Sequence, residues 1–198
     1  MVQHAEEGRG GAEAPRGRRM REVVGSIEGE YRRYKALGEK AIEQLADEQL
    51  CRPGSAGGNS IAALVWHVSG NLASRFTDFR RSDGEKPWRD RDAEFLERTV
   101  SRQEIREKWE EGWSVLFGSL ADLDDRELSS IVKIRGVALS VLEALHRSLA
   151  HASYHVGQIV FLAKELRNGE WRSLSIPPGG SAAYNANPAG EKPPGSSR

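Results

Sequence analysis

The chain has 198 residues, and its 29 Lys and Arg residues are balanced by 29 Asp and Glu residues, so the formal net charge is zero. A chain of this length forms one domain with a proper core, and the balanced charge argues against nonspecific binding to nucleic acid or anionic lipid. The single cysteine, Cys51, excludes an intramolecular disulfide, and the lack of both a long apolar run and an apolar leader predicts a cytoplasmic protein.

The two ends of the chain differ in composition from its middle. Residues 1–19 are rich in Gly, Ala and charge without periodicity, and residues 177–198 are rich in Pro, Gly and Ser. These compositions predict a disordered N-terminal tail and an irregular C-terminal tail on either side of one domain at 20–176. Met20 directly precedes the first periodic segment, which suggests the hypothesis that translation starts there.

The first half of the predicted domain contains two amphipathic helices. One spans about 20–46, with an apolar or aromatic residue at every third or fourth position. The segment "CRPGSAGGNS" then breaks the chain. The second helix is predicted to begin with Asn59 as its N-cap and to run through Phe79.

The second half predicts two further helices with clear start signals. The third spans 101–120 and opens with a capping box, a Ser followed three residues later by Glu. "SSIVKIRGVAL" predicts a short hairpin that turns at Gly136. The fourth helix, 140–166, opens with the same box and ends before Asn168 and Gly169. Together the four segments predict an all-α four-helix bundle with antiparallel neighbours and a hairpin-like connection before the last helix.

Three histidines are the candidate metal ligands. At about 100° per residue, His151 and His155 share one flank of the fourth helix, roughly 80 to 120° from the centre of its apolar stripe, and His67 has a similar place on the second helix. Bundles build metal sites from such side chains on facing helices, and three imidazoles leave a fourth position open, as in catalytic sites. Spacing alone also fits surface or core histidines, so the pattern leaves both interpretations open.

Other polar and aromatic side chains have weaker signals. Asn71, one turn after His67, is a candidate to orient that imidazole. His146 lies about 140° around the helix from His151 and is predicted to face solvent. Cys51 is interpreted as an incidental thiol in a linker, and Tyr154 as a packing or interface residue.

Two aromatic residues bear on assembly and on the site entrance. Trp66 lies roughly 140° from the apolar stripe of its helix, which predicts either a homodimer contact or packing under the N-terminal helix or a long loop. The loop 83–88 is predicted either to form a lid or substrate contact, or to be a capped connection anchored by Trp88.

Several segments resemble the DinB-like superfamily of metalloenzymes: "NSIAALVWHVSGN", "LHRSLAHASYHVGQIVFLAK", "SRFTDFRRSDGEKPWRDRDAEF" and "LSIPPGGSAAYNAN". The last two resemble an uncharacterised bacterial branch of that superfamily. The resemblance implies a four-helix bundle of unusual connectivity, frequent dimers, and a divalent-metal site with His67, His151 and His155 as ligands. Nickel or zinc is the expected metal, with iron or manganese as alternatives.

Two functions are compatible with this resemblance. Related proteins include thiol S-transferases and a thiol-dependent isomerase, which predicts a metal-dependent enzyme that activates a thiol or water for transfer to, or hydrolysis of, a small molecule. The alternative is a non-catalytic, stress-associated dimer with a structural or vestigial metal. An open coordination position facing a pocket would favour the enzyme, and a sealed site would favour the alternative.

Overall fold

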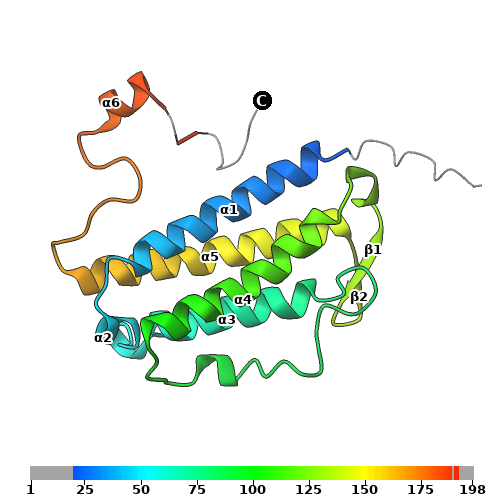
Figure 1. Cartoon of the computed structure of the whole chain (residues 1–198), viewed down its shortest axis with the longest axis horizontal. Coiled ribbons are helices and arrows are strands. Elements are labelled where there is room, and N and C mark those ends of the chain that lie inside the picture. Colours follow the sequence, from blue (N-terminus) through cyan, green and yellow to red (C-terminus); the bar gives the residue numbers. More distant parts are fainter. Residues whose placement is uncertain (1–19, 189, 192–198) are drawn as a thin grey trace, which may run out of the picture.

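The computed structural model describes residues 20–188, 190 and 191, so the tail predicted at 1–19 lies outside the described residues. Its architecture is the predicted bundle of four long helices with a small two-stranded hairpin at one end (Figure 1). The long helices are α1 (Glu22–Ile42), α3 (Ile61–Phe76), α4 (Arg102–Ala121) and α5 (Val141–Arg167). The short elements are α2 (Asp47–Leu50), α6 (Ser181–Ala186), β1 (Ile131–Ile134) and β2 (Val137–Ser140), together with three single 3₁₀ turns.

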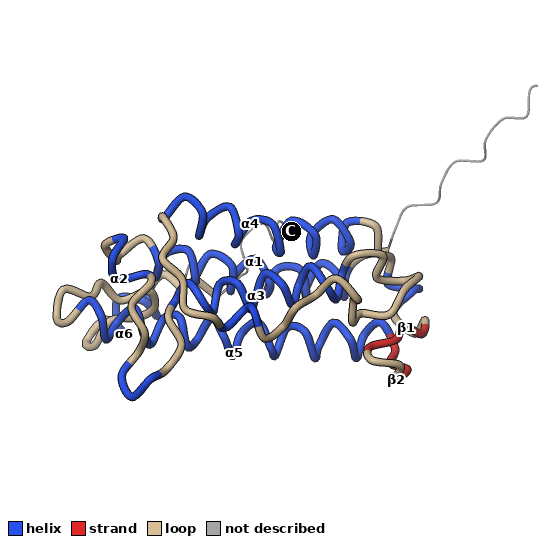
Figure 2. Tube along the Cα trace, turned by 90° about the horizontal axis from the view of Figure 1, so that it is seen from below, coloured by secondary structure: helices blue, strands red, loops and turns tan. Residues whose placement is uncertain are grey.

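The directions of the helices differ from the prediction of antiparallel neighbours. α3 packs most closely on α4, and α1 on α5, and within each of these pairs the helices run the same way (Figure 1). The reason is the connection at 77–101, which returns along the length of the bundle before α4 begins. Figure 2 shows this connection crossing in front of the helices. Its path lays a long loop over one side of α3.

α3 is shorter at both ends than predicted. Its N-cap is Ser60, whose hydroxyl accepts a hydrogen bond from the Ala63 amide, so the assignment of Asn59 as the cap is wrong. The helix ends at Phe76 and not at Phe79 because Thr77 is extended and Asp78 adopts a left-handed conformation with φ 48°. The long connection therefore begins three residues before the predicted end of the helix.

The start signals of the last two helices and the hairpin are confirmed. Ser101 and Ser140 each form the predicted capping box with a Glu three residues later. The hairpin pairs β1 with β2 in antiparallel register. Arg135 and Gly136 occupy its turn, both with positive φ, as a tight two-residue hairpin turn requires. Asn168 ends α5 in the left-handed conformation.

The core lies between the two helix pairs. Its largest fully buried side chains include Trp109, Trp113 and Tyr31, and Tyr31 donates a hydrogen bond to the Leu145 carbonyl across the core. α3 and α4 approach closely at Gly112, where a Cβ would lie 2.5 Å from the Ser69 Cα. This contact is possible only because position 112 lacks a side chain.

The C-terminal segment returns to the N-terminal half of the bundle. The Gln44 side chain makes two hydrogen bonds with the backbone of Arg172. The region from 177, predicted to be irregular, contains the short helix α6. None of the helices in the described residues is long and apolar enough to cross a membrane.

Candidate metal centre

The three predicted histidines lie together where α3 faces α5. His67 comes from the middle of α3, and His151 and His155 from consecutive turns of α5. One ligand nitrogen of each ring can be chosen so that all three lie within 4.8 Å of one another. The Nε2 atoms of His67 and His151 are 3.2 Å apart.

This geometry fits a divalent metal. Two imidazole nitrogens on one tetrahedral ion at metal–nitrogen distances of about 2.0–2.1 Å are about 3.3 Å apart, close to the 3.2 Å between His67 and His151. Without a metal, the same distance allows His151 Nε2–H to donate a hydrogen bond to His67 Nε2, and a bound metal would take the place of that proton. The cluster is compatible with a metal site, and its geometry does not identify the metal.

Glu94 holds the buried His67 in position. Its Oε2 lies 2.8 Å from His67 Nδ1, and the same carboxylate makes two hydrogen bonds with Arg89, at 2.8 and 2.9 Å. Burial alone would raise the pKa of Glu94, but the hydrogen bonds from His67 and Arg89 hold that pKa below its usual value. An ionised Glu94 accepts a hydrogen bond from His67 Nδ1–H, so the Nε2 lone pair of His67 points at the other histidines.

The connection at 77–101 seals the outer side of His67. Phe95 lies against the imidazole with the ring centres 4.5 Å apart. Glu94 fits between this connection and α3 because position 70 is a glycine, and any Cβ there would overlap the Glu94 carboxylate. As a result His67 is 3% exposed, and the sequence-based placement of His67 at the border of the core is corrected to full burial.

The two histidines of α5 remain half-buried, as their flanking position predicts. His155 Nδ1 lies 2.7 Å from Gln158 Oε1, which orients that ring as Glu94 orients His67. Burial, reinforced by the neighbouring His155 and His67 and by the positive charges of Arg89 and Arg75, lowers the pKa of His151 to about 3. Burial also lowers the pKa of His155. Both imidazoles are therefore neutral near pH 7, which is the form that binds a metal.

A cavity of about 360 Å³ opens over the three histidines. All three rings line it, together with residues of α3, the long connection, the hairpin and the first half of α5. The histidine cluster therefore faces a space large enough for a small molecule.

The hairpin is attached to the long connection beside this cavity. The Asp83 carboxylate accepts hydrogen bonds from the backbone amides of Arg135 and Gly136, at 2.7 Å each. Glu85 bridges Arg75 of α3 and Arg135 of the hairpin, at 3.0 and 2.9 Å. These contacts hold the hairpin against the end of α3, where Ile134 and Arg135 form part of the cavity wall.

The structure settles most of the weaker expectations. Asn71 lines the cavity, but the group bonded to His67 Nδ1 is Glu94, so a role for Asn71 stays a prediction. His146 is exposed, as predicted. Cys51 is half-buried, lies within hydrogen-bonding distance of the Val100 backbone and is outside the histidine group.

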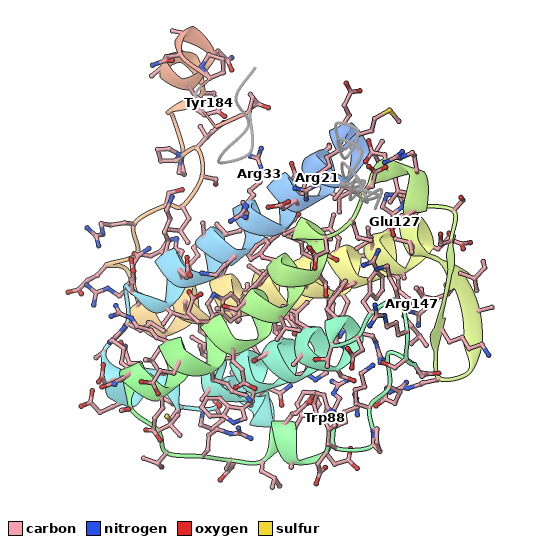
Figure 3. All side chains as sticks on the ribbon, turned by 45° about the vertical axis from the view of Figure 1, so that its right-hand side comes forward. Arg21, Arg33, Trp88, Glu127, Arg147 and Tyr184 are labelled. Carbon is pink, nitrogen blue, oxygen red and sulfur yellow. The ribbon has the colours of Figure 1, made fainter. Side chains whose placement is uncertain are left out.

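Of the aromatic residues considered in the sequence, Trp66 is half-buried, whereas Trp88 and Tyr154 are exposed. Trp66 is half-buried under Arg98 of the long connection, whose guanidinium lies 4.5 Å from the ring centre, so the loop-packing alternative is confirmed for this residue. Trp88 is 58% exposed (Figure 3), so anchoring by Trp88 is wrong. The residues at 83–88 stay outside the cavity wall, to which the same connection contributes Arg89 and Arg91 instead. Tyr154 lines the cavity edge and is 65% exposed.

Sequence reasoning missed Glu94 and the arginines of the cavity. Glu94 is 27 positions from His67 in a segment without helical or strand periodicity, so spacing had no means of pairing them. The one available signal was that "RDRDAEF" belongs to a segment that carries the family resemblance.

Comparison with known proteins agrees with the fold. A family model described as "Protein of unknown function (DUF1572)" matches residues 19–180. A crystal structure of a DinB-like protein from Bacillus cereus ATCC 10987 is similar, with a TM-score of 0.54 and 17% sequence identity over 70% of this chain and 89% of that one. No curated protein matches the chain.

Proposed function

Because the chain belongs to the DUF1572 family and has the DinB-like fold, we propose that it is a divalent-metal-dependent enzyme of small-molecule chemistry. His67, His151 and His155 would hold the metal. A metal bound by three imidazoles lowers the pKa of a thiol or water and so supplies a nucleophile at neutral pH. The reaction class proposed is transfer of a low-molecular-weight thiol or hydrolysis of a small electrophilic substrate.

One observation carries this proposal: the three imidazoles line a cavity of about 360 Å³ that is open to solvent. A structural metal is normally enclosed by four protein ligands, whereas a catalytic one has three and keeps a position for substrate or water. The three-histidine set and the adjoining cavity both match the catalytic arrangement.

The protein's own side chains prepare the site. Glu94 accepts a hydrogen bond from His67 Nδ1–H, and Gln158 accepts one from His155 Nδ1–H, so both rings present Nε2 to the cavity. Arg89 keeps the Glu94 carboxylate ionised and fixed. Asn71, on the cavity wall, is proposed to hydrogen-bond a ligand or solvent molecule beside His67.

Nickel or zinc is the metal we expect, with iron and manganese as alternatives, because a set of neutral imidazoles suits nickel, zinc and iron. Manganese is the least favoured of the four, since like magnesium and calcium it prefers oxygen ligands. The test is elemental analysis of protein purified without an affinity tag, followed by a screen for thiol transfer and ester or amide hydrolysis. About one metal per chain, together with an activity that disappears on chelation and returns with metal, supports the proposal. A metal-free protein that resists reloading contradicts it.

A structural role for the same metal is the second candidate, and one contact favours it. His67 and His151 belong to different helices and are 3.2 Å apart, so an ion there would link α3 to α5 and stabilise the bundle. This role predicts a large rise in melting temperature on metal addition without activity toward any substrate in the screen.

A homodimer is proposed as the assembly in which this site operates. Tyr154 and Phe161 are 65% and 71% exposed on α5 and are seven residues apart, which places them on one helix face. Burying them against a second copy would remove two large apolar side chains from water. Light scattering at micromolar concentration tests this, and a monomer there contradicts it. A cytoplasmic location stays a prediction.

A further inference from the structure

The cavity over the histidines has an unusual charge. Five arginines line it, and the described residues in its wall include no Asp or Glu. The arginines are Arg75, Arg89, Arg91, Arg135 and Arg147. Since the whole chain has a net charge of zero, this concentration of positive charge is a local property of the cavity.

Three of these arginines have carboxylate partners behind the wall. Arg75 and Arg135 share Glu85. Arg89 is paired with Glu94, and that carboxylate also accepts a hydrogen bond from His67 Nδ1–H. Two carboxylates therefore offset three guanidinium groups, and the charge of the wall is not neutralised even where ion pairs exist.

The other two arginines have spare hydrogen-bonding capacity. The carboxylate paired with Arg91 is that of Asp92, 3.7 Å away on a side chain that is 98% exposed, and the Arg91 guanidinium otherwise lies over the Phe95 ring. Arg147 makes no ion pair with any residue that the structure describes. Figure 3 places Arg147 near the end of α5 that adjoins the hairpin. Exposed ion pairs such as that of Arg91 are weak, so both guanidinium groups are available to a ligand.

Arg147 lies on the same face of α5 as two of the candidate metal ligands. Arg147, His151 and His155 follow one another at intervals of four residues on α5, so they share one face of the helix. Successive positions are about 6 Å apart along the helix axis. An anionic group bound by Arg147 would hold the rest of a small molecule next to the histidines.

Apart from the arginines, the histidines, Asn71 and Ser148, the wall of the cavity is apolar and largely aromatic. It is formed by Phe76, Phe79, Phe95, Ile134, Ala144 and the ring of Tyr154. A volume of about 360 Å³ is at the lower end of the range for small-molecule pockets. The occupant is therefore small, with an apolar body.

We propose that the ligand of this cavity is a small amphipathic anion, with an apolar or aromatic body against the phenylalanines and a carboxylate or phosphate group bound by Arg147 or Arg91. Guanidinium groups bind both oxyanions through paired hydrogen bonds. That this ligand is the substrate rests on the proposed function. The binding site itself is independent of it, because the arginines are outside the histidine cluster.

Isothermal titration calorimetry tests the proposal with three probes: 3-phenylpropionate, phenyl phosphate and the neutral 3-phenyl-1-propanol. Each is titrated into the full chain as purified and again after chelation, because an anion could otherwise bind only by coordinating a metal. The variants are Arg147→Gln and Arg91→Gln. Arg52→Gln is the matched control, since Arg52 is exposed and lies outside the cavity wall.

We expect at least one anionic probe to bind about tenfold more tightly than the alcohol, with and without chelation. We also expect Arg147→Gln, Arg91→Gln or both to weaken that binding about tenfold while Arg52→Gln leaves it unchanged. Comparison of the two anions shows whether carboxylate or phosphate is preferred. The proposal is overturned if the anions bind no better than the alcohol, if neither cavity variant weakens binding, or if Arg52→Gln weakens it equally.

The outcome is separable from that of the proposed function. Anion binding by a chain that takes up no metal would contradict the enzyme proposal alone. Metal binding without preference for the anionic probes would contradict the anion proposal alone.

Discussion

Replacing Glu94 with Gln tests how the site is held together. Gln has nearly the same shape but no charge, and its amide has one acceptor oxygen where the carboxylate has two. In the native protein the two oxygens serve Arg89 and His67 together. With the amide oxygen in the place of Oε2, the variant still accepts from His67 Nδ1 and Arg89 Nη2, but Arg89 Nε then faces the amide NH2 group instead of an acceptor. The variant also removes the counter-charge of Arg89.

The size of the effect follows from burial. The side chains of Arg89 and Glu94 are 2% and 8% exposed, and removing one partner of a buried ion pair costs about 3–5 kcal/mol. Because Gln still accepts from His67 and from one Arg89 nitrogen, we expect a loss at the lower end of that range, about 3 kcal/mol in the free energy of unfolding of the metal-free protein. Replacement of the carboxylate bonded to a ligating histidine lowers metal affinity about 10- to 100-fold.

Two measurements check this prediction separately. Urea unfolding after chelation gives stability without any contribution from metal, and a competition titration against a chelating dye gives metal affinity. Glu111→Gln is the matched control, since Glu111 is 54% exposed in its ion pair with Lys108 and such pairs contribute less than about 1 kcal/mol.

Wild-type stability and wild-type metal affinity in Glu94→Gln would refute the reasoning. A stability loss with unchanged metal affinity would show that Glu94 supports the bundle but does not orient a ligand. An equal effect of Glu111→Gln would show that the loss is unrelated to burial.

Three further predictions follow from the same structure. His151→Ala should abolish stoichiometric metal binding with little change in helical circular dichroism, whereas His146→Ala should retain the metal; full occupancy in His151→Ala would place the site elsewhere. Metal-free protein should be less stable at pH 5 than at pH 7. The unfolded His151 imidazole has a pKa near 6.5 and the folded one about 3, so its contribution is complete above pH 6.5 and is lost as the pH falls toward 3. The loss by pH 5 is at most about 2 kcal/mol, less where solvent screens the ring, and urea titrations should show a smaller pH effect in His151→Gln. Gly112→Ala should destabilise the bundle by about 1–3 kcal/mol because its Cβ would lie 2.5 Å from the Ser69 Cα, while Gly118→Ala, with open space around it, should be neutral or stabilising in thermal unfolding.

Local signals in the sequence were sufficient for several elements. The capping boxes at Ser101 and Ser140 and the left-handed stop at Asn168 are confirmed because each depends on hydrogen bonds or backbone angles within a few residues. The hairpin is confirmed for the same reason, since Gly136 permits its turn. The ends of α3 were predicted wrongly. Asn59 and Ser60 are both good N-cap residues, so the sequence did not decide between them. At the other end, the apolar periodicity continues to Phe79, but the left-handed backbone of Asp78 is incompatible with a helix there.

In the candidate site, too, the local features were predictable from the sequence and the contacts between distant segments were not. Helical spacing in the sequence determined that His151 and His155 share a face of α5, because the period of a helix is a local property. Spacing could not bring His67 to them; the family resemblance implied it and the tertiary structure places it there. Only the tertiary structure decided that α3 and α4 run in the same direction, and that the connection at 77–101 brings Glu94 onto His67 and Arg89 and Arg91 into the cavity wall. That connection has no periodic pattern of its own. Its position depends on contacts such as those of Glu94 at Gly70 and Asp83 at the hairpin turn, which join residues far apart in sequence and come into existence only when the bundle has packed.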